Sequence, residues 1–446
     1  MKTFYIKTLG CKVNQYESDG IAAGLEDNGM VRAKKAQHCD VCIINTCAVT
    51  ARAGMQSRQA VRKLARDNPG AKIIVTGCHA QTEPEKIPKT GPSLQIVCHQ
   101  DKTCIADHVF AGPQAPPLAF SPPDHSADNR FHSFDRPVHG NMTRAYLKIQ
   151  DGCNAFCTYC IVPYARGASV SMPEHRVLQH LETLGQKGFN EVILTGIHAG
   201  LYGRDLTPRS SLVRLVETIQ KKKPVHRIRL SSIEPNEIDG RLLDLAGPSG
   251  ILCDHFHIPL QSGDDTILQK MKRPYTAGFF TDTIHGIHEK LPSAGIGVDI
   301  LAGFPTETDQ QFENTYNLIR QLPVSYLHVF PFSPRKGTPA FYFTPKVDDT
   351  VIKERCRRLR DLGQQKRAAF ITANLGKIRE GVVQHRHDPH TGCLTAVTTN
   401  YLDVFLEKNN DIKGKIVDLV CEQCDSNLRI YGKLQTAFPL QVHAVP

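Results

Sequence analysis

The chain has 446 residues, of which 40% are hydrophobic and 22% charged, as expected for a globular protein of two to four domains. No apolar run approaches the roughly 18 residues of a membrane helix, and no signal peptide is visible, so we expect a cytoplasmic protein without membrane association. The net charge of +10 suits a polyanionic partner such as RNA, and fifteen cysteines fit a reducing compartment where thiols bind metal.

Three cysteines near the amino terminus each follow an apolar run. The runs are residues 4–9 before Cys11, 41–46 before Cys47 and 73–76 before Cys78. Such runs are typical of buried parallel strands, and their spacing matches βα repeats. Because parallel strands end at one edge of a sheet, we expect the three thiols to meet there. Buried core thiols are the ordinary alternative, but the position of all three just past a strand end favours a metal cluster.

This first α/β unit is expected to occupy residues 1–112. A polar, proline-rich stretch at 113–141 has no clear periodicity and is expected to be a linker. A second unit at 142–372 alternates strand-like and helix-like segments. Its expected strands are 145–149, 191–195, 227–231, 255–259, 297–302 and 326–330. Repeated βα units predict a parallel sheet that curls toward a barrel.

A C-x₃-C-x₂-C motif, formed by Cys153, Cys157 and Cys160, follows the first of these strands. Three thiolates at this spacing can bind three irons of a [4Fe–4S] cluster and leave the fourth iron open. Structural zinc usually takes four ligands, and no fourth Cys or His stands at the expected distance. Complete disulfide pairing is excluded because three is odd. The motif therefore predicts a cluster whose open iron is free to bind a small molecule, which is what S-adenosylmethionine (SAM) needs for chelation.

The remainder of the chain is expected to be a long helix at 348–374 and then a small β-barrel within 373–446. Short strand-like runs separated by turn residues indicate the barrel. From Ile371 onward the sequence holds eight basic and eight acidic residues, which is a poor electrostatic footprint for RNA. Whether this barrel binds RNA is left open by the sequence.

The cysteine motifs carry a resemblance to known enzymes. The motif of Cys153, Cys157 and Cys160 matches the signature of the radical SAM superfamily. The segments around Cys11, Cys47 and Cys78 resemble the amino-terminal domain of methylthiotransferases, which are radical SAM enzymes with two [4Fe–4S] clusters. The resemblance covers nearly the whole chain. It implies an α/β methylthiotransferase domain, a partial (β/α)₆ radical SAM barrel and a TRAM-like β-barrel.

Three segments resemble one branch of that family more than the others. They are GCKVNQYES at 10–18, RLSSIEP at 229–235 and HVFPFSPRKGTPA at 328–340. This branch modifies N6-threonylcarbamoyladenosine at position 37 of tRNA to its 2-methylthio derivative. The other branches modify isopentenyladenosine in tRNA or an aspartate of a ribosomal protein, and both stay open as alternatives. A non-catalytic iron–sulfur protein that binds RNA is the alternative from another class.

The resemblance also implies roles for individual residues. Cys153, Cys157 and Cys160 would hold the SAM-binding cluster, and Cys11, Cys47 and Cys78 would hold an auxiliary cluster that carries sulfur. The expected SAM contacts are Thr195, Gly196, Glu234, Gln261, Ser262, Val298 and Asp299. The expected substrate contacts are Arg273 at RNA phosphate, and Arg335 and Lys336 at the threonyl carboxylate or at phosphate.

No protein acid, base or nucleophile is expected, because the cofactors carry the chemistry. The expected partners are the anticodon loop of tRNA, an external one-electron donor and a sulfur donor. The protein is expected to be a monomer. The sequence identifies neither the donors nor the set of tRNAs.

Overall fold

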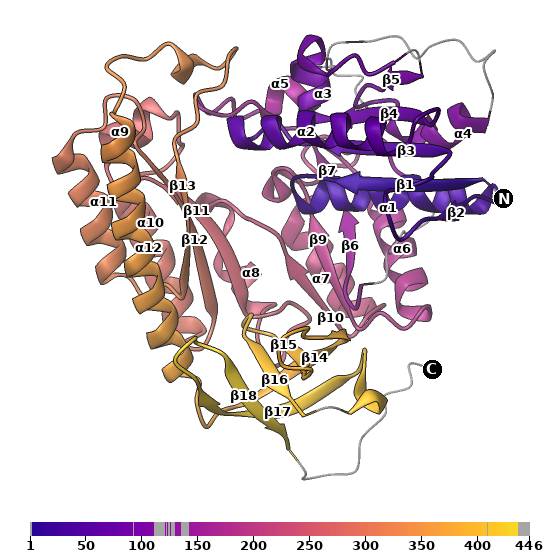
Figure 1. The fold of residues 1–446 in the computed structure, drawn as a ribbon. Coiled ribbons are helices and arrows are strands. Elements are labelled where there is room, and N and C mark those ends of the chain that lie inside the picture. Colours follow the sequence, from indigo (N-terminus) through magenta and orange to yellow (C-terminus); the bar gives the residue numbers. More distant parts are fainter. Residues whose placement is uncertain are drawn as a thin grey trace.

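Three β-structures succeed one another along the chain (Figure 1). The computed structural model describes residues 2–91, 93–110, 121, 123, 125, 130–134, 142–407 and 409–435. Most of the predicted linker at 113–141, and the end of the predicted carboxyl-terminal barrel, lie outside the described residues. None of the described helices is long and apolar enough to cross a membrane.

The first structure is a five-stranded parallel sheet in the order β2-β1-β3-β4-β5. Its strands are β1 (Thr3–Thr8), β2 (Val31–Arg32), β3 (Val41–Thr46), β4 (Lys72–Gly77) and β5 (Leu94–Ile96). Its helices are α1 (Lys12–Asp27), α2 (Ala51–Asp67), α3 (Cys78–Thr82) and α4 (Ile105–Phe110). Every residue of β3 is buried, which explains its continuous apolar run. The predicted parallel α/β unit is confirmed, while the short edge strands β2 and β5 had no sequence signal.

The second structure is an open barrel of six parallel strands. The strands are β6 (Ala145–Lys148), β9 (Glu191–Thr195), β10 (Arg227–Leu230), β11 (His255–Gln261), β12 (Gly295–Ala302) and β13 (Tyr326–Pro331). They form two three-stranded sheets, and isolated bridges such as Ser232 with His257 join β10 to β11. The predicted partial (β/α)₆ barrel is therefore confirmed. A separate two-stranded antiparallel sheet pairs β7 (Gln150–Asp151), which follows β6 along the chain, with β8 (Val170–Ser171).

Helices cover the outer face of this barrel (Figure 1). They are α6 (Glu174–Gln186), α7 (Leu212–Lys222), α8 (Gly240–Asp244), α9 (Asp265–Lys270), α10 (Ala277–Lys290), α11 (Asp309–Gln321) and α12 (Asp349–Thr372). The short helix α5 (Val162–Arg166) instead packs against α3 of the amino-terminal unit. Asp348 caps the amino terminus of the long helix α12, since its carboxylate accepts a hydrogen bond from the backbone N–H of Thr350. Its position along β13 closes that side of the barrel wall.

The third structure is a closed five-stranded barrel in the order β14-β15-β16-β18-β17. Its strands are β14 (Ile378–His387), β15 (Leu394–Thr398), β16 (Asp403–Leu406), β17 (Ile416–Cys424) and β18 (Ile430–Leu434). The small β-barrel predicted for this region is confirmed. Strand β15 was missed in the sequence.

Two arginines of β10 join the open barrel to this closed barrel. Arg227 and Arg229 both form ion pairs with Glu191, which is fully buried on β9. Arg229 also donates hydrogen bonds to the carbonyls of Thr398 and Thr399, at 2.9 and 2.8 Å. The RLSSIEP segment, whose first residue is Arg229, therefore has a structural role in addition to its resemblance to one family branch.

We predict that Glu191→Gln destabilises the junction between the two barrels. The change would leave the guanidiniums of Arg144, Arg227 and Arg229 without their shared carboxylate. Loss of one member of a buried ionic group typically costs about 3–5 kcal/mol. The thermal melting midpoint should therefore fall clearly. The matched control is Glu182→Gln on the exposed face of α6, which should melt like the wild type.

We also predict that the stabilising effect of Glu191 depends on pH. Although burial opposes ionisation, the neighbouring arginines hold the pKa of Glu191 well below its usual range. A depressed carboxyl pKa contributes stability above the unfolded value, near 4.5, and that contribution is lost as the pH falls further. The gap in melting midpoint between wild type and Glu191→Gln should therefore narrow as the pH is lowered below about 4.5. A gap that stays constant down to acid unfolding would contradict this role of the charge.

Candidate active site and metal centres

Cys11, Cys47 and Cys78 meet at the carboxyl edge of the amino-terminal sheet. Cys11 is the N-cap of α1, Cys47 directly follows β3, and Cys78 opens α3 after β4. A Cβ built on Gly10 would lie 3.2 Å from the Cys47 Sγ, and the charges of Cys11 and Cys78 both act on Cys47. Burial, followed by the charge of Cys78, raises the pKa of Cys47 to about 11. The predicted meeting of the three thiols is confirmed, and their cluster role stays a prediction.

Asn14 and Gly77 fix the loops that carry these thiols. The Asn14 side-chain amide donates to the carbonyls of Leu9 and Thr46, at 2.7 and 3.1 Å, and so links the ends of β1 and β3. Gly77 has a positive φ of 97°, and a Cβ there would lie 2.4 Å from the backbone N and O of Thr46. A side chain at this position would therefore push the Cys78 loop away from the Cys47 loop.

Cys153, Cys157 and Cys160 share one loop between β7 and α5. The Cys153 N–H donates to Gly167 O at 3.0 Å, and the Cys160 N–H donates to Cys157 O at 2.9 Å. Beneath the loop, Gln150 Nε2 donates to the carbonyls of Asp151 and Gly152, both at 2.8 Å. These bonds hold the loop in a defined shape around three thiols whose charges act on one another.

The donor sets fit iron–sulfur clusters better than single zinc ions. A tetrahedral zinc with Zn–S bonds near 2.3 Å would bring its sulfurs to about 3.8 Å from one another. Among the described residues, three ligand atoms lie within 4.8 Å of one another only in His257–Asp299–His328 and Glu17–His99–Asp151. Both cysteine triads are wider than this, as the four-iron clusters that three cysteines can hold require.

A cavity of about 480 Å³ lies beside Cys157. Its size is typical of a small-molecule site. Its lining includes Cys157, His198, Glu234, Glu237 and Arg273. Glu234 is thus the one predicted SAM contact that lines this cavity.

Arg273 is placed differently from its prediction as a phosphate contact. Its side chain is buried and forms an ion pair with Glu234. One guanidinium nitrogen lies 3.3 Å from the Cys157 Sγ, and its Nε donates to the Tyr275 hydroxyl at 2.8 Å. The guanidinium is therefore occupied at the cavity wall, where its positive charge favours a thiolate at Cys157. This corrects the predicted contact with RNA phosphate.

His198 was not singled out in the sequence. Its Nδ1 lies 3.5 Å from the Cys153 Sγ and its Nε2 lies 2.7 Å from Glu237 Oε1. Although burial works in the other direction, these partners raise the pKa of His198 to about 10. The signal was available, because His198 stands only two residues past the strand-end pair Thr195-Gly196.

The remaining predicted SAM contacts are not among the residues that line this cavity. Gly196 gives room to Gln150, since a Cβ there would lie 2.8 Å from the Gln150 Oε1. Ser262 is buried, with its Oγ 3.3 Å from the Thr315 hydroxyl. Val298 is buried in mid-strand between Ile258 and Leu327.

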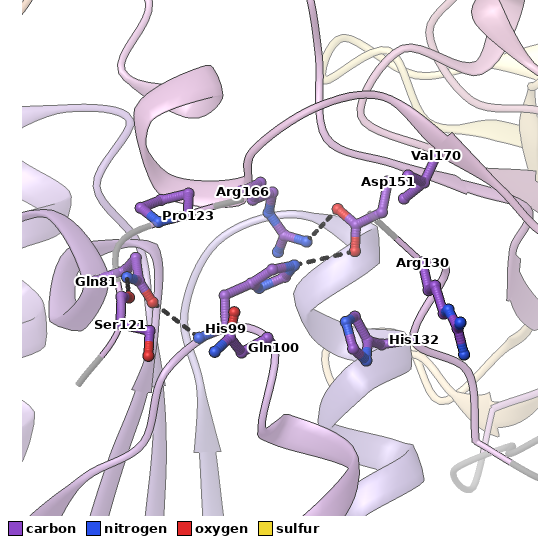
Figure 2. Close-up of a pocket in the computed structure, with 10 residues that line it drawn as sticks. All are labelled: Gln81, His99, Gln100, Ser121, Pro123, Arg130, His132, Asp151, Arg166 and Val170. Carbon is purple, nitrogen blue, oxygen red and sulfur yellow. Dashed lines mark hydrogen bonds and ion pairs between the residues drawn. The ribbon is translucent and has the colours of Figure 1, made fainter. Parts of the chain in front are cut away.

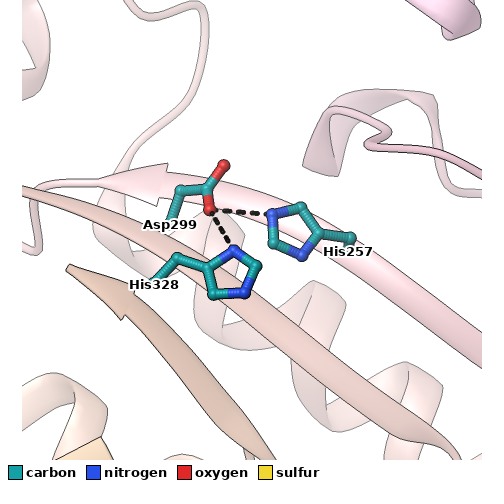
Figure 3. Close-up of side chains that lie close together, drawn as sticks. All are labelled: His257, Asp299 and His328. Atoms are coloured by element: carbon teal, nitrogen blue, oxygen red, sulfur yellow. Dashed lines mark hydrogen bonds and ion pairs between the residues drawn. The ribbon is translucent and has the colours of Figure 1, made fainter. Parts of the chain in front are cut away.

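Both side chains pack within the barrel wall, so a contact of Ser262 or Val298 with SAM would be made through the backbone, and it stays a prediction. Thr195 is buried at the end of β9, and Gln261 is half-buried with a φ of 67°. Their contact with SAM stays a prediction. One Asp299 oxygen lies 2.8 Å from His257 Nε2 and 3.3 Å from His328 Nδ1 (Figure 3), and its contact with SAM stays a prediction.

Arg166 lies between the two cysteine centres, and Figure 2 shows its guanidinium paired with Asp151. It ends α5, six residues after Cys160, and its guanidinium contacts Glu17 at 2.9 Å, Asp151 at 2.8 Å and Asn14 Oδ1 at 2.6 Å. Its positive charge also acts on Cys11. The helix that leaves the Cys160 loop therefore inserts its last side chain into the auxiliary centre.

An apolar contact joins the same two centres. Ile161, which follows Cys160, packs in one buried cluster with Ala48, Cys78 and Ala165. Residues adjoining Cys47 and Cys160 thus meet across the boundary between the two α/β units. The sequence motifs locate each triad within its own unit, but this packing brings the two triads to one interface.

Arg335 is likewise not available to a substrate. It is buried, and its guanidinium pairs with Glu83 at 2.7 Å, which links the loop after β13 to the amino-terminal unit. This corrects its predicted contact with a threonyl carboxylate. Lys336 is exposed, so its predicted role stays a prediction.

Known protein families match the two α/β units of the chain separately. Residues 3–99 match the family described as uncharacterized protein family UPF0004, and residues 147–319 match the radical SAM superfamily. In fold, the chain is similar to the radical S-adenosylmethionine methyltransferase TsrM from Kitasatospora setae. The TM-score is 0.55 and the identity 15%, over 76% of this chain and 77% of that chain.

Three curated relatives are similar over almost their whole length. The threonylcarbamoyladenosine tRNA methylthiotransferase MtaB of Bacillus subtilis is 36% identical over 94% of this chain and 93% of the relative. The MtaB of Aquifex aeolicus is 34% identical over 92% of this chain and 98% of the relative. A tRNA-2-methylthio-N(6)-dimethylallyladenosine synthase of Pelotomaculum thermopropionicum is 31% identical over 94% of both chains. With both domains, both cysteine triads and these relatives, the chain belongs to the radical SAM methylthiotransferase family.

Proposed function

We propose that this protein is a tRNA methylthiotransferase that converts N6-threonylcarbamoyladenosine at position 37 to its 2-methylthio derivative. The higher identity to MtaB, 34–36% against 31% for the dimethylallyladenosine enzyme, supports this substrate over its isopentenyl counterpart. We further propose a monomer in the cytoplasm that depends on an external one-electron donor and a sulfur donor.

The observation that carries the proposal is the interface between the two cysteine triads. Transfer of a sulfur-containing group requires the sulfur and the activated base to meet. Ile161 and Cys78 belong to one buried apolar cluster, and Arg166 reaches Glu17 and Asn14 beside Cys11. A scaffold that only bound RNA would have no need for two thiol triads packed together in this way.

The protein groups have binding and orienting roles. We assign Cys153, Cys157 and Cys160 to one [4Fe–4S] cluster, and Cys11, Cys47 and Cys78 to the other. When bound, these clusters and SAM supply the reductive cleavage chemistry and the sulfur. Arg273 and His198 place positive charge against Cys157 and Cys153, respectively. Glu234, held by Arg273, faces the adjoining cavity with a carboxylate suited to hydroxyl or ammonium groups of SAM.

The target base must leave the stack of the anticodon loop to reach such a buried site, as in other enzymes that modify bases. No protein acid or base is assigned, because the cofactors carry the bond-making steps.

The test is nucleoside mass spectrometry of tRNA from cells with and without the gene. Deletion should remove 2-methylthio-N6-threonylcarbamoyladenosine and cause its non-thiolated precursor to accumulate. A plasmid copy should restore the product, and a copy lacking Cys153, Cys157 and Cys160 should not. Loss of 2-methylthio-isopentenyladenosine instead would assign the other tRNA branch, and an unchanged nucleoside profile would reject the proposed function.

A further inference from the structure

Three neighbouring strands of the open barrel each carry one potential metal ligand on the same face of their sheet. Asp299 on β12 is the register partner of His328 on β13 and of Pro259 on β11. His257 stands two residues before Pro259, and residues two apart on a strand share a face. Neighbouring residues along these strands pack into the hydrophobic core on the other face: Ile258, Val298 and Leu327.

The three side chains converge on one point (Figure 3). His257 Nε2 lies 2.8 Å and His328 Nδ1 lies 3.3 Å from the same Asp299 oxygen, Oδ1. One ligand atom from each residue lies within 4.8 Å of the other two. A metal ion with bonds of about 2.0–2.2 Å holds neighbouring ligand atoms about 3–3.5 Å apart. The two distances to Asp299 are close to this spacing.

Asp299 differs in its partners from three buried carboxylates described above. Glu17, Asp151 and Glu191 each form an ion pair with an arginine. Within the part of the chain that the structure describes, Asp299 has no lysine or arginine at ion-pair distance, and its charged contacts are the two histidines. The Asp299 side chain is only 20% exposed. Because carboxylates withdrawn from water normally pair with a cation or bind a metal, a divalent ion would supply the charge that this carboxylate lacks.

Tyr326 holds His257 in the orientation that a metal ligand needs. The Tyr326 hydroxyl lies 3.3 Å from His257 Nδ1 and 2.8 Å from His255 Nε2. Gly297 leaves room for the phenol ring, since a Cβ there would lie 2.1 Å from it. Metal-binding histidines typically donate from their other ring nitrogen to such a partner, which fixes the tautomer. With Nε2 on the ion, His257 Nδ1–H donates to Tyr326, whose hydroxyl donates to His255.

Hydrogen bonds alone are the other explanation of this group. Both imidazoles would then donate to Asp299 Oδ1, while Oδ2 makes no hydrogen bond to a described residue. The His328 distance of 3.3 Å is longer than the roughly 2.7–2.9 Å of a charge-assisted hydrogen bond to a carboxylate. A shared ion accounts both for the convergence on one oxygen and for the longer distance.

The second His–carboxylate group in the described part of the chain does not fit a metal ion. Glu17, His99 and Asp151 also place three ligand atoms within 4.8 Å of one another. Their carboxylates, however, already pair with cations, at 2.8–2.9 Å for Arg166 and 2.7 Å for Lys148. This positive charge would repel a metal ion. The group on β11, β12 and β13 is therefore the candidate site.

We propose that His257, Asp299 and His328 bind one divalent transition-metal ion in addition to the two cysteine-bound clusters. Two imidazoles and one carboxylate are suited to zinc or ferrous iron. Three protein ligands leave a coordination position open, and the His328 side chain is 53% exposed, so this position can take water or an oxygen ligand. The site is independent of the proposed function, because metal binding is measured without turnover.

The test determines zinc and iron per chain in the cluster-loaded protein, after equilibration with micromolar zinc and anaerobic gel filtration. The wild type should retain about one zinc beside the roughly eight irons of its clusters. His328→Ala and Asp299→Asn should retain almost no zinc and keep their iron. Tyr326→Phe should bind zinc about 10- to 100-fold more weakly, as is typical when a partner of a metal ligand is removed. The matched controls are His285→Ala and Asp282→Asn on the exposed face of α10.

X-ray absorption at the zinc edge tests the ligand set in the wild type without any substitution. Nitrogen and oxygen ligands at about 2.0–2.2 Å are expected, whereas sulfur near 2.3 Å would place the zinc at cysteines. Ferrous iron as the native metal would be found in the protein as isolated. It would be about one iron beyond those of the clusters, absent from His328→Ala and Asp299→Asn and exchanged by zinc.

Three results would overturn the inference. The first is a wild type that retains neither zinc nor additional iron, which would leave a hydrogen-bonded group only. The second is equal zinc in the wild type, His328→Ala and Asp299→Asn, which indicates adventitious binding only. The third is a zinc-edge spectrum with sulfur ligands. If a variant lost cluster iron together with zinc, it would be misfolded, and the wild-type spectrum would decide.

Discussion

Replacement of Cys153, Cys157 and Cys160 by alanine is expected to abolish cleavage of SAM to 5′-deoxyadenosine, while about four irons per chain remain. The reciprocal triple variant at Cys11, Cys47 and Cys78 is also expected to keep about four irons, against about eight in the reconstituted wild type. This variant should still cleave SAM but add no methylthio group to tRNA. The measurements are iron analysis after anaerobic reconstitution, and chromatography of nucleosides and of SAM products.

The physical reason for this division is that the two triads belong to different sheets. Each is held by its own loop bonds: Asn14 and Gly77 fix one, and Gln150 fixes the other. Removal of one triad therefore leaves the support of the other intact. Cys104, which is exposed, provides the control, and Cys104→Ala should change neither iron content nor turnover. A well-folded auxiliary variant that retained all its iron, or that lost SAM cleavage, would contradict the assignment.

The meeting of Cys11, Cys47 and Cys78 was predictable because it depends on topology alone. Three apolar runs at βα spacing imply parallel strands, and parallel strands end at one edge. The local C-x₃-C-x₂-C motif required no tertiary information at all. The barrel was predictable for the same reason, since its strands follow one another in space in the order of the sequence.

The roles of the arginines were not predictable in the same way. Arg273, Arg335 and Arg166 are paired with Glu234, Glu83 and Glu17, which are 39, 252 and 149 residues away in sequence. A positive side chain near a predicted site is equally compatible with solvent, phosphate or a distant carboxylate, and only the packing of the units decides. Strand β15 was missed although three of its five residues are β-branched, and it pairs with β14 and β16.

Glu17→Gln is expected to be among the most destabilising single changes in the chain. Glu17 is buried and faces three cations, with Lys102, Arg166 and Lys148 all in ion pairs with it. Although burial opposes ionisation, these cations hold the pKa of Glu17 well below its usual range. Loss of the carboxylate removes their main counterion, at a cost of about 3–5 kcal/mol. The control is Glu26→Gln on the exposed part of the same helix.

A second substitution tests whether charge is the cause. The buried charged group consists of three cations and two carboxylates: Lys102, Lys148, Arg166, Glu17 and Asp151. His99 beside them is neutral, because burial, reinforced by the charge of Lys102, lowers the pKa of His99 to about 4. Its net charge is +1 in the wild type, +2 in Glu17→Gln, and +1 again when Arg166→Met is added. The double variant should therefore melt above the value that the two single variants predict by simple addition.

Iron analysis of Glu17→Gln, Arg166→Met and the double variant separates the effect on stability from the effect on cofactor binding. Arg166 is the side chain that α5 inserts beside Cys11, so Arg166→Met should weaken retention of the auxiliary cluster even where the melting midpoint is recovered. Additive losses in the melting midpoint would mean that the hydrogen bonds of Arg166, and not the balance of buried charge, hold the two α/β units together. A recovered midpoint with a depleted auxiliary cluster would instead show that one guanidinium serves both purposes, which follows from its position between the two cysteine centres.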